Sequence, residues 1–192
     1  TGIRSIMMMA TVTALLVAPF QEMLAGVSDL VFARGATGLA TMASSAGFGA
    51  MSAGLWIGWR GRTQGLVRIE LAAVLVSAAA LMVFSLSHIF WLTCAATTII
   101  AFSMVCAAVS GDSLVQNAVD PTMRARVTSV ETMINIGFPA LGAILIGWAG
   151  TRFGIQMPLA VSAGLAFGVW LIFSRILWAQ RESLERPRER VI

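Results

Sequence analysis

Long apolar segments separated by short polar ones make up most of this chain. Six of these segments are predicted to be helices, and they cover about residues 5–25, 36–59, 66–87, 89–111, 127–149 and 157–178. A helix of about 20 apolar residues is long enough to cross a hydrocarbon core roughly 30 Å thick. The pattern therefore predicts an all-α membrane protein, with a six-span transmembrane bundle over residues 1–179 and a polar tail over residues 180–192.

Polar residues mark the ends of the predicted spans. The first span has no charge before Glu22 and holds Pro19 near its far end, where neighbouring groups can satisfy the backbone that a proline frees. A short basic hinge with Arg124 and Arg126 joins the fourth and fifth spans. The tail from residue 180 is too polar to enter a bilayer, so we expect it to be solvated and cytoplasmic, with a short surface helix as the alternative.

The composition also places the chain in a bilayer. Hydrophobic residues make up 58% of the 192 residues and charged residues 11%, whereas average soluble proteins have about 25% charged residues. The net charge of +4 does not indicate a nucleic-acid partner, because the arginines lie in short connectors between apolar runs. Cys94 and Cys106 share one apolar run at a spacing that does not match a zinc pair, so we expect packed thiols, no metal and no cofactor.

The arginines predict how the spans are oriented. All 13 basic residues are arginine, and with six spans only Arg34 and Arg152 fall on one side of the membrane. The other eleven fall on the opposite side, which is the bias that cytoplasmic connectors show. Both ends of this segment are therefore predicted to be cytoplasmic.

Small residues predict where helices approach closely. In the second predicted span they recur every four positions, which places them on one stripe of the helix; these residues are Ala46, Ala50, Gly54 and Gly58. Such a stripe lets a neighbouring helix backbone come near. We expect the same packing role for Gly137 and Gly142 in the fifth span.

A weak internal repeat links these two spans. The letters GFGAM at 47–51 and IGW at 57–59 resemble GFPAL at 137–141 and IGW at 146–148. Pairing the second span with the fifth is what an inverted repeat of three plus three spans predicts. Chance similarity between two segments rich in glycine and alanine is the alternative.

Polar side chains at membrane depth are the candidates for function, because a charge at the bilayer centre costs about 2.5–3.5 kcal/mol on insertion scales. Glu131 lies one turn into the fifth span and Asp112 ends the fourth. Two roles stay open for them: they carry a proton in a water-filled pathway, or they pair with Arg124 or Arg126 as a cytoplasmic gate or a staple of the hinge. Further candidates for lining a cavity are Glu22, Gln116 and Asn135.

One short motif resembles that of an enzyme, but the rest of the chemistry is missing. Residues 111–114 read GDSL, a signature of a serine hydrolase family. That reaction needs a histidine base, yet His88 is the only histidine and it precedes the serine at the opposite membrane face of the predicted topology. We therefore predict that the chain is not an enzyme.

The region around the hinge resembles a known family. Residues 113–129 read SLVQNAVDPTMRARVTS and residues 151–154 read TRFG, which is similar to the region joining the tenth and eleventh helices of major facilitator superfamily exporters. The closest resemblance is to enterobactin exporters and macrolide efflux proteins. Two departures, the missing aspartate in residues 58–65 (GWRGRTQG) and the lack of a basic residue in the fourth span, point to the C-terminal half of such a protein.

The resemblance implies a fold, a function and partners. The fold would be the C-terminal six-helix half of a twelve-span transporter, lying in a bacterial inner membrane and completed by an N-terminal six-span half. The function would be secondary active transport, as an antiporter that exports a small apolar or amphipathic substrate by alternating access. The alternative is a self-sufficient six-span protein that forms a dimeric pore or a membrane scaffold.

Overall fold

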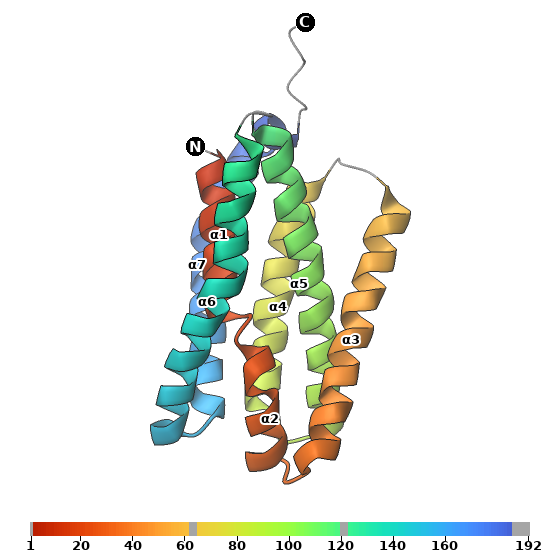
Figure 1. Cartoon of the computed structure of the whole chain (residues 1–192), viewed down its shortest axis with the longest axis vertical. Coiled ribbons are helices and arrows are strands. Elements are labelled where there is room, and N and C mark those ends of the chain that lie inside the picture. The colour runs from red at the N-terminus through yellow and green to blue at the C-terminus, as the bar shows by residue number, and fades with distance from the viewer. Residues whose placement is uncertain (1, 62–64, 120–122, 186–192) are drawn as a thin grey trace, which may run out of the picture.

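The structure is a computed structural model that describes residues 2–61, 65–119 and 123–185, in which every regular element is an α-helix (Figure 1). The helices are α1 (Gly2–Leu16), α2 (Phe20–Leu30), α3 (Gly35–Arg60), α4 (Leu66–Leu86), α5 (Phe90–Ala118), α6 (Arg124–Phe153) and α7 (Gln156–Glu185). They stand side by side along one long axis, and the start of α1 and the end of α7 lie at the same end of the bundle (Figure 1). The prediction of an all-α chain is confirmed.

Within the described residues, five segments are long and apolar enough to cross a membrane. They are Met7–Leu30, Leu66–Leu86, Phe90–Gln116, Ala125–Phe153 and Gln156–Arg175. The protein is therefore a multi-pass membrane protein. Helix α3, which covers the second predicted span, has the necessary length with 26 residues but is not among these five segments, so the prediction of six spans is not confirmed.

The first predicted span is not one continuous helix. The helical pattern stops before Pro19, which has no backbone N–H to donate. The Thr13 carbonyl oxygen accepts hydrogen bonds from the backbone N–H groups of Val17 and Ala18, at 2.9 and 3.1 Å. Backbone groups at membrane depth must find hydrogen-bond partners inside the protein. At the break between α1 and α2, one carbonyl oxygen serves as the partner of two backbone N–H groups.

The core is built around α4, which contacts α5 on one side and α7 on another. Phe84 of α4 is buried edge-on against Phe20 of α2, with ring centroids 6.1 Å apart. Nearer the other end of α4, the indole N–H of Trp170 in α7 donates a 2.7 Å hydrogen bond to the backbone carbonyl of Leu71. This bond ties α4 and α7 together.

Replacing Trp170 by phenylalanine tests how much this hydrogen bond contributes to stability. The ring remains apolar, but the donor to the Leu71 carbonyl is lost. Hydrogen bonds between membrane helices contribute about 0.6–2 kcal/mol, so we expect the free energy of unfolding in detergent to fall by about that amount. Trp148→Phe is the matched control, because Trp148 is 61% exposed. Equal destabilisation by both substitutions would show that the bond contributes nothing.

The predicted packing glycines fall into two groups. Gly142 lies directly against the Leu15 carbonyl oxygen and the Pro19 ring, so α6 meets α1 at the helix break. Gly54, Gly58 and Gly137 have no other group within 4 Å of the place where a Cβ would stand, and all three are exposed in this chain.

The close approach of α3 to α5 is made elsewhere, by Gly49, which lies against the backbone of Thr98. Ala46 and Ala50 are half-buried beside this contact and face α5 across a shallow pocket. At the other end of the chain, α7 continues to Glu185, so the first residues of the predicted polar tail are helical. Residues 186–192 of that tail lie outside the described residues.

Candidate functional site

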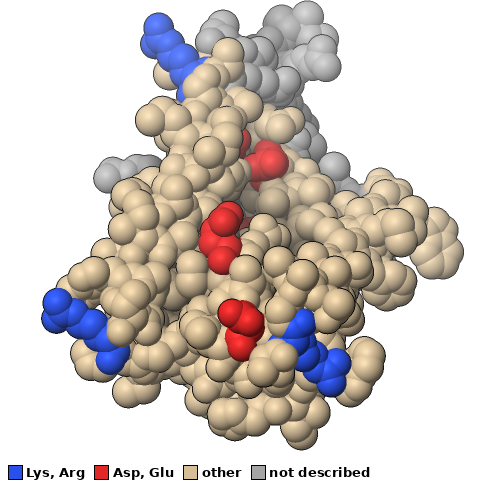
Figure 2. Space-filling model, turned by 60° about the horizontal axis from the view of Figure 1, so that its bottom comes forward, with Lys and Arg blue, Asp and Glu red and all other residues tan. Residues whose placement is uncertain are grey.

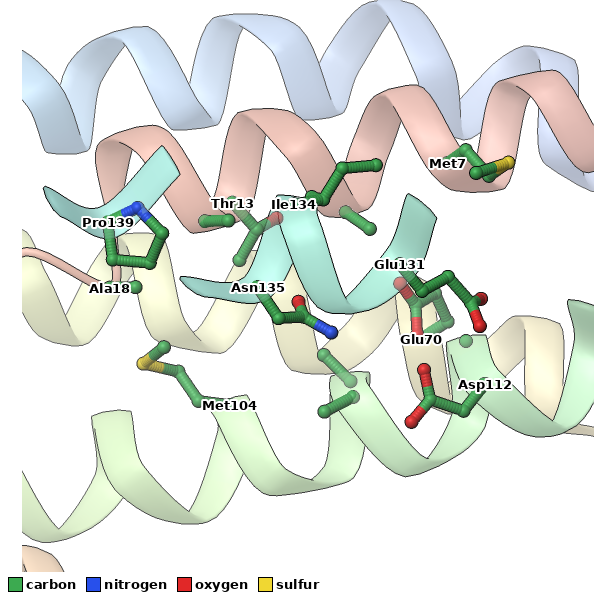
Figure 3. Close-up of a pocket in the computed structure, with 15 residues that line it drawn as sticks. Met7, Thr13, Ala18, Glu70, Met104, Asp112, Glu131, Ile134, Asn135 and Pro139 are labelled. Carbon is green, nitrogen blue, oxygen red and sulfur yellow. The ribbon is translucent and has the colours of Figure 1, made fainter. Parts of the chain in front are cut away.

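A cavity of about 120 Å³ lies between α1, α4, α5 and α6 (Figure 3). Most of its wall is apolar and comes from small side chains such as Ala14, Ala107 and Ala108, with methionines at its margins. Pro139 of α6 lines it, and so does Ala18 at the break between α1 and α2. The carboxyl groups that line it lie toward one end of the cavity and come from three different helices, whereas Thr13 and Asn135 lie farther along it (Figure 3).

Glu70 is the most deeply placed of these polar groups. It lies in the second turn of α4 and is only 3% exposed. Its Oε2 atom is fully buried and accepts no hydrogen bond from any described residue. The carboxyl group lies 3.4 Å from where a Cβ of Gly111 would stand, so the absence of a side chain on α5 lets Glu70 fit against that helix.

Asp112 and Glu131 complete a group of three carboxyl side chains with Glu70, which we call the acidic cluster. Asp112 lies in the last turns of α5 and Glu131 in the third turn of α6, and both are half-buried. Asp112 is near enough to Glu70 and to Glu131 to interact with each of them electrostatically. Figure 3 shows the three carboxyl groups gathered at one end of the cavity.

The acidic cluster has no arginine among its described partners. No described arginine forms an ion pair with Glu70, Asp112 or Glu131. Arg126 is exposed, and the side chain of Arg124 lies outside the described residues. The predicted pairing of Asp112 and Glu131 with the hinge arginines therefore stays a prediction.

The other predicted polar candidates are placed differently. Asn135 lines the cavity one turn beyond Glu131 on α6 (Figure 3). Glu22 is exposed on α2, and Gln116 is exposed near the end of α5, so neither contributes to this cavity. Figure 2 shows acidic side chains along the middle of the face seen there, the upper ones in a hollow, with arginines toward the edges.

Glu70 was not predicted as a site residue. In the sequence it opens the third span and reads as an interfacial charge close to Arg68. One signal was present: Glu70 is separated by three and four residues from Val67 and Val74, and residues at these spacings share a helix face. Both valines are buried, so an acid between them had to be buried as well.

The acidic cluster suits a proton better than a metal ion. No group of three or more described His, Cys, Asp or Glu side chains is arranged to hold a metal ion. A single proton neutralises one carboxylate and adds an O–H donor that a neighbouring carboxylate can accept. The arrangement is therefore capable of holding, passing on and releasing protons at membrane depth.

Comparison with known proteins returns no relative. No family model, no curated protein and no solved structure matches the chain.

Proposed function

We propose that this chain is half of a secondary active transporter that exports a small apolar or amphipathic compound by alternating access. The observation that carries the proposed proton coupling is the convergence of Glu70, Asp112 and Glu131, from three candidate membrane spans, on one cavity. The half-transporter arrangement and the direction of transport rest on the resemblance to major facilitator exporters. Ionisable groups inside a membrane are costly and mark substrate or proton pathways. The wall of the cavity is apolar, as a substrate of this kind requires, but its volume of about 120 Å³ is below the roughly 300–1,000 Å³ of ligand sites. We therefore propose that the partner half completes the substrate site.

The helices around the cavity also suit a transporter. Sites in secondary transporters form at broken helices, where one bundle rocks against another. Here the break before Pro19 lies in the wall of the cavity, and Pro139 interrupts the hydrogen-bond ladder of α6 on the same wall. In this mechanism the acidic cluster takes up a proton when the cavity opens to one side and releases it when the cavity opens to the other.

Helix contacts support an inverted repeat of three plus three spans. Taking α1 and α2 as one span, the repeat exchanges that span with α5, α3 with α6, and α4 with α7. Under this exchange the contact of α4 with α5 becomes the contact of α7 with α1, and both contacts exist. The contact of α3 with α5 becomes that of α6 with α1, and both of these exist too. The contacts of α2 with α3 and of α6 with α7 lack a comparable counterpart between α5 and α6 and between α3 and α4, so the helix contacts agree with the repeat only in part.

The uncovered helices support a partner bundle. Exposed small residues on α3 and α6, among them Gly54, Gly58 and Gly137, leave space for another helix to approach closely. In the three-plus-three repeat described above, α3 and α6 are equivalent helices. We propose that the N-terminal six-span half covers them.

The size of the natural gene product tests for this partner half. An immunoblot against the 180–192 tail is expected to give a band at about twice the 20.3 kDa of this chain. A band near 20.3 kDa would contradict the two-half arrangement. In that case a second copy of this chain would have to cover α3 and α6, as in the dimeric pore or scaffold.

The distribution of arginines predicts the orientation of the protein in the membrane. Arg60, Arg68 and Arg126 lie at the end of the bundle that also holds the start of α1 and the end of α7, whereas Arg34 and Arg152 lie at the other end. Excess arginine marks the cytoplasmic side. We therefore propose that both ends of the segment lie in the cytoplasm. The resemblance to major facilitator exporters implies that the membrane is a bacterial inner membrane.

Export is tested in cells. The natural gene product is expressed in a bacterial host that lacks its own efflux pumps, and growth is measured against a panel of toxic apolar and amphipathic compounds. We expect a higher inhibitory concentration for at least one compound and the loss of that protection when a protonophore collapses the proton gradient. Unchanged sensitivity to the whole panel would contradict the proposal.

Replacing both hinge arginines, Arg124→Gln with Arg126→Gln, tests the proposed cytoplasmic gate. We expect normal insertion into the membrane and export reduced to background, because the gate loses the positive charges that close it. Membrane content is measured by immunoblot and export by the growth panel. Arg152→Gln, at the opposite end of α6, is the matched control and keeps export. Normal export from the double variant would rule out a role for the hinge in gating.

A further inference from the structure

A second and larger pocket opens on the side of the bundle, between α3 and α4, and α5 forms its floor; we call it the lateral groove. It encloses about 670 Å³ and lies apart from the cavity of the acidic cluster. Its walls are mainly apolar and include Phe48, Trp56, Ile69 and Phe102. A volume of this size is typical of sites that bind a molecule rather than a single water or ion.

The lateral groove has a charged end. Arg60, in the last turn of α3, and Arg68, in the first turn of α4, both line it. Arg60 lies over the ring of Trp56, with its guanidinium carbon 5.9 Å from the ring centroid. Its Nη2 atom lies 3.0 Å from where a Cβ of Gly65 would stand, so the missing side chain leaves room for the guanidinium at the end of the groove.

The length of the lateral groove matches one leaflet of a bilayer. Along α4 it extends from Gly65 to Val76, which is about 16 Å at 1.5 Å per residue. Half of a hydrocarbon core of about 30 Å is about 15 Å. The groove is thus apolar over the depth of one leaflet and positively charged at the membrane surface.

We propose that the lateral groove binds one anionic phospholipid from the cytoplasmic leaflet. An acyl chain lies along the apolar walls, and the phosphate contacts Arg60 and Arg68. Each guanidinium has five N–H donors, so both arginines can contact a phosphate while they keep the interactions that they make within the protein. Basic pockets between membrane helices on the cytoplasmic side suit anionic headgroups. The choice of leaflet rests on the topology proposed above, whereas the site itself is independent of transport, because the lateral groove shares no lining residue with the acidic cavity.

Native mass spectrometry of the full chain in neutral detergent tests this site. The probes are dioleoyl-phosphatidylglycerol and dioleoyl-phosphatidylcholine, which have the same acyl chains and differ in net charge. We expect the apparent affinity for phosphatidylglycerol to be about tenfold higher. Arg60→Gln with Arg68→Gln is expected to remove this preference. Arg34→Gln with Arg152→Gln, which removes the same charge at the other end, is expected to keep it.

A second pair of variants tests the apolar part of the lateral groove. Ala72→Trp fills the groove and is expected to weaken the binding of both lipids, whereas Val83→Trp, on an exposed position of α4 outside the groove, does not. A preference for phosphatidylglycerol that survives loss of Arg60 and Arg68, or unchanged binding by Ala72→Trp, would overturn the proposal. So would inorganic phosphate that displaces phosphatidylglycerol at equal concentration, because the site would then bind a soluble anion.

Discussion

Replacing Glu70 by glutamine is expected to abolish proton-coupled export while the bundle remains folded. Glutamine has nearly the shape of glutamic acid, so it fits the narrow space against Gly111. It cannot take up or release a proton, and the deepest proton-binding group of the acidic cluster is lost. In the growth panel, cells with this variant should be as sensitive as cells without the protein.

The same substitution is expected to stabilise the protein. The Oε2 atom of Glu70 is buried and has no hydrogen-bond partner among the described residues. The amide of a glutamine would instead offer N–H donors to the nearby Asp112 carboxylate. A gain of about 1 kcal/mol corresponds to a rise in the unfolding midpoint of about 2–4 °C. Lost export together with an equal or higher midpoint separates a functional role for Glu70 from a structural one.

Glu22→Gln is the matched control for Glu70→Gln. It makes the same chemical change at an exposed position of α2 outside the cavity. We expect export and the unfolding midpoint both to stay at their original values. Full export from Glu70→Gln, or equal loss of export from both variants, would contradict the assignment of Glu70 to the proton pathway.

Replacing Gly142 by valine is expected to destabilise the bundle strongly. A side chain there would meet the Leu15 carbonyl oxygen and the Pro19 ring, and neither can move without disturbing the break between α1 and α2. Overpacking of this kind costs about 1–3 kcal/mol, so the midpoint of thermal unfolding in detergent should fall by about 3–10 °C. We also expect a lower yield of monodisperse protein.

Gly147→Val on the same helix separates this effect from helix propensity. No other group lies within 4 Å of a Cβ at Gly147, so the substitution brings the same β-branched residue without a clash. We expect its midpoint to stay within about 2 °C of the original. Similar losses in the two variants would mean that the contact of α6 with α1 is not as close as described.

The helices were predictable from the sequence because long apolar runs dictate helices in a membrane. The break before Pro19 was not, because a proline is compatible with both a continuous and a broken membrane helix. The break lies where α6 packs against α1 through Gly142, and this contact between distant segments cannot be read from the local sequence. Polarity alone left the start of the tail open between a solvated chain and a short surface helix, and α7 continues through its first charged residues to Glu185.

The candidate site was predictable only in part. Asp112, Glu131 and Asn135 stood out because each interrupts or flanks an apolar run. Glu70 did not, because its burial depends on how α4 packs against α5 and on the missing side chain at Gly111. Local patterns reveal which residues are costly at membrane depth, but contacts between distant helices decide which of them meet.

Proton movement in proteoliposomes tests the central claim most directly. The natural gene product is reconstituted with a pH-sensitive dye inside the vesicles, and the first compound identified by the growth panel is added. We predict a proton flux that starts with the compound, runs opposite to its transport and disappears in Glu70→Gln. Transport of the compound without any proton flux, or an undiminished flux in Glu70→Gln, would contradict the proposed role of the acidic cluster.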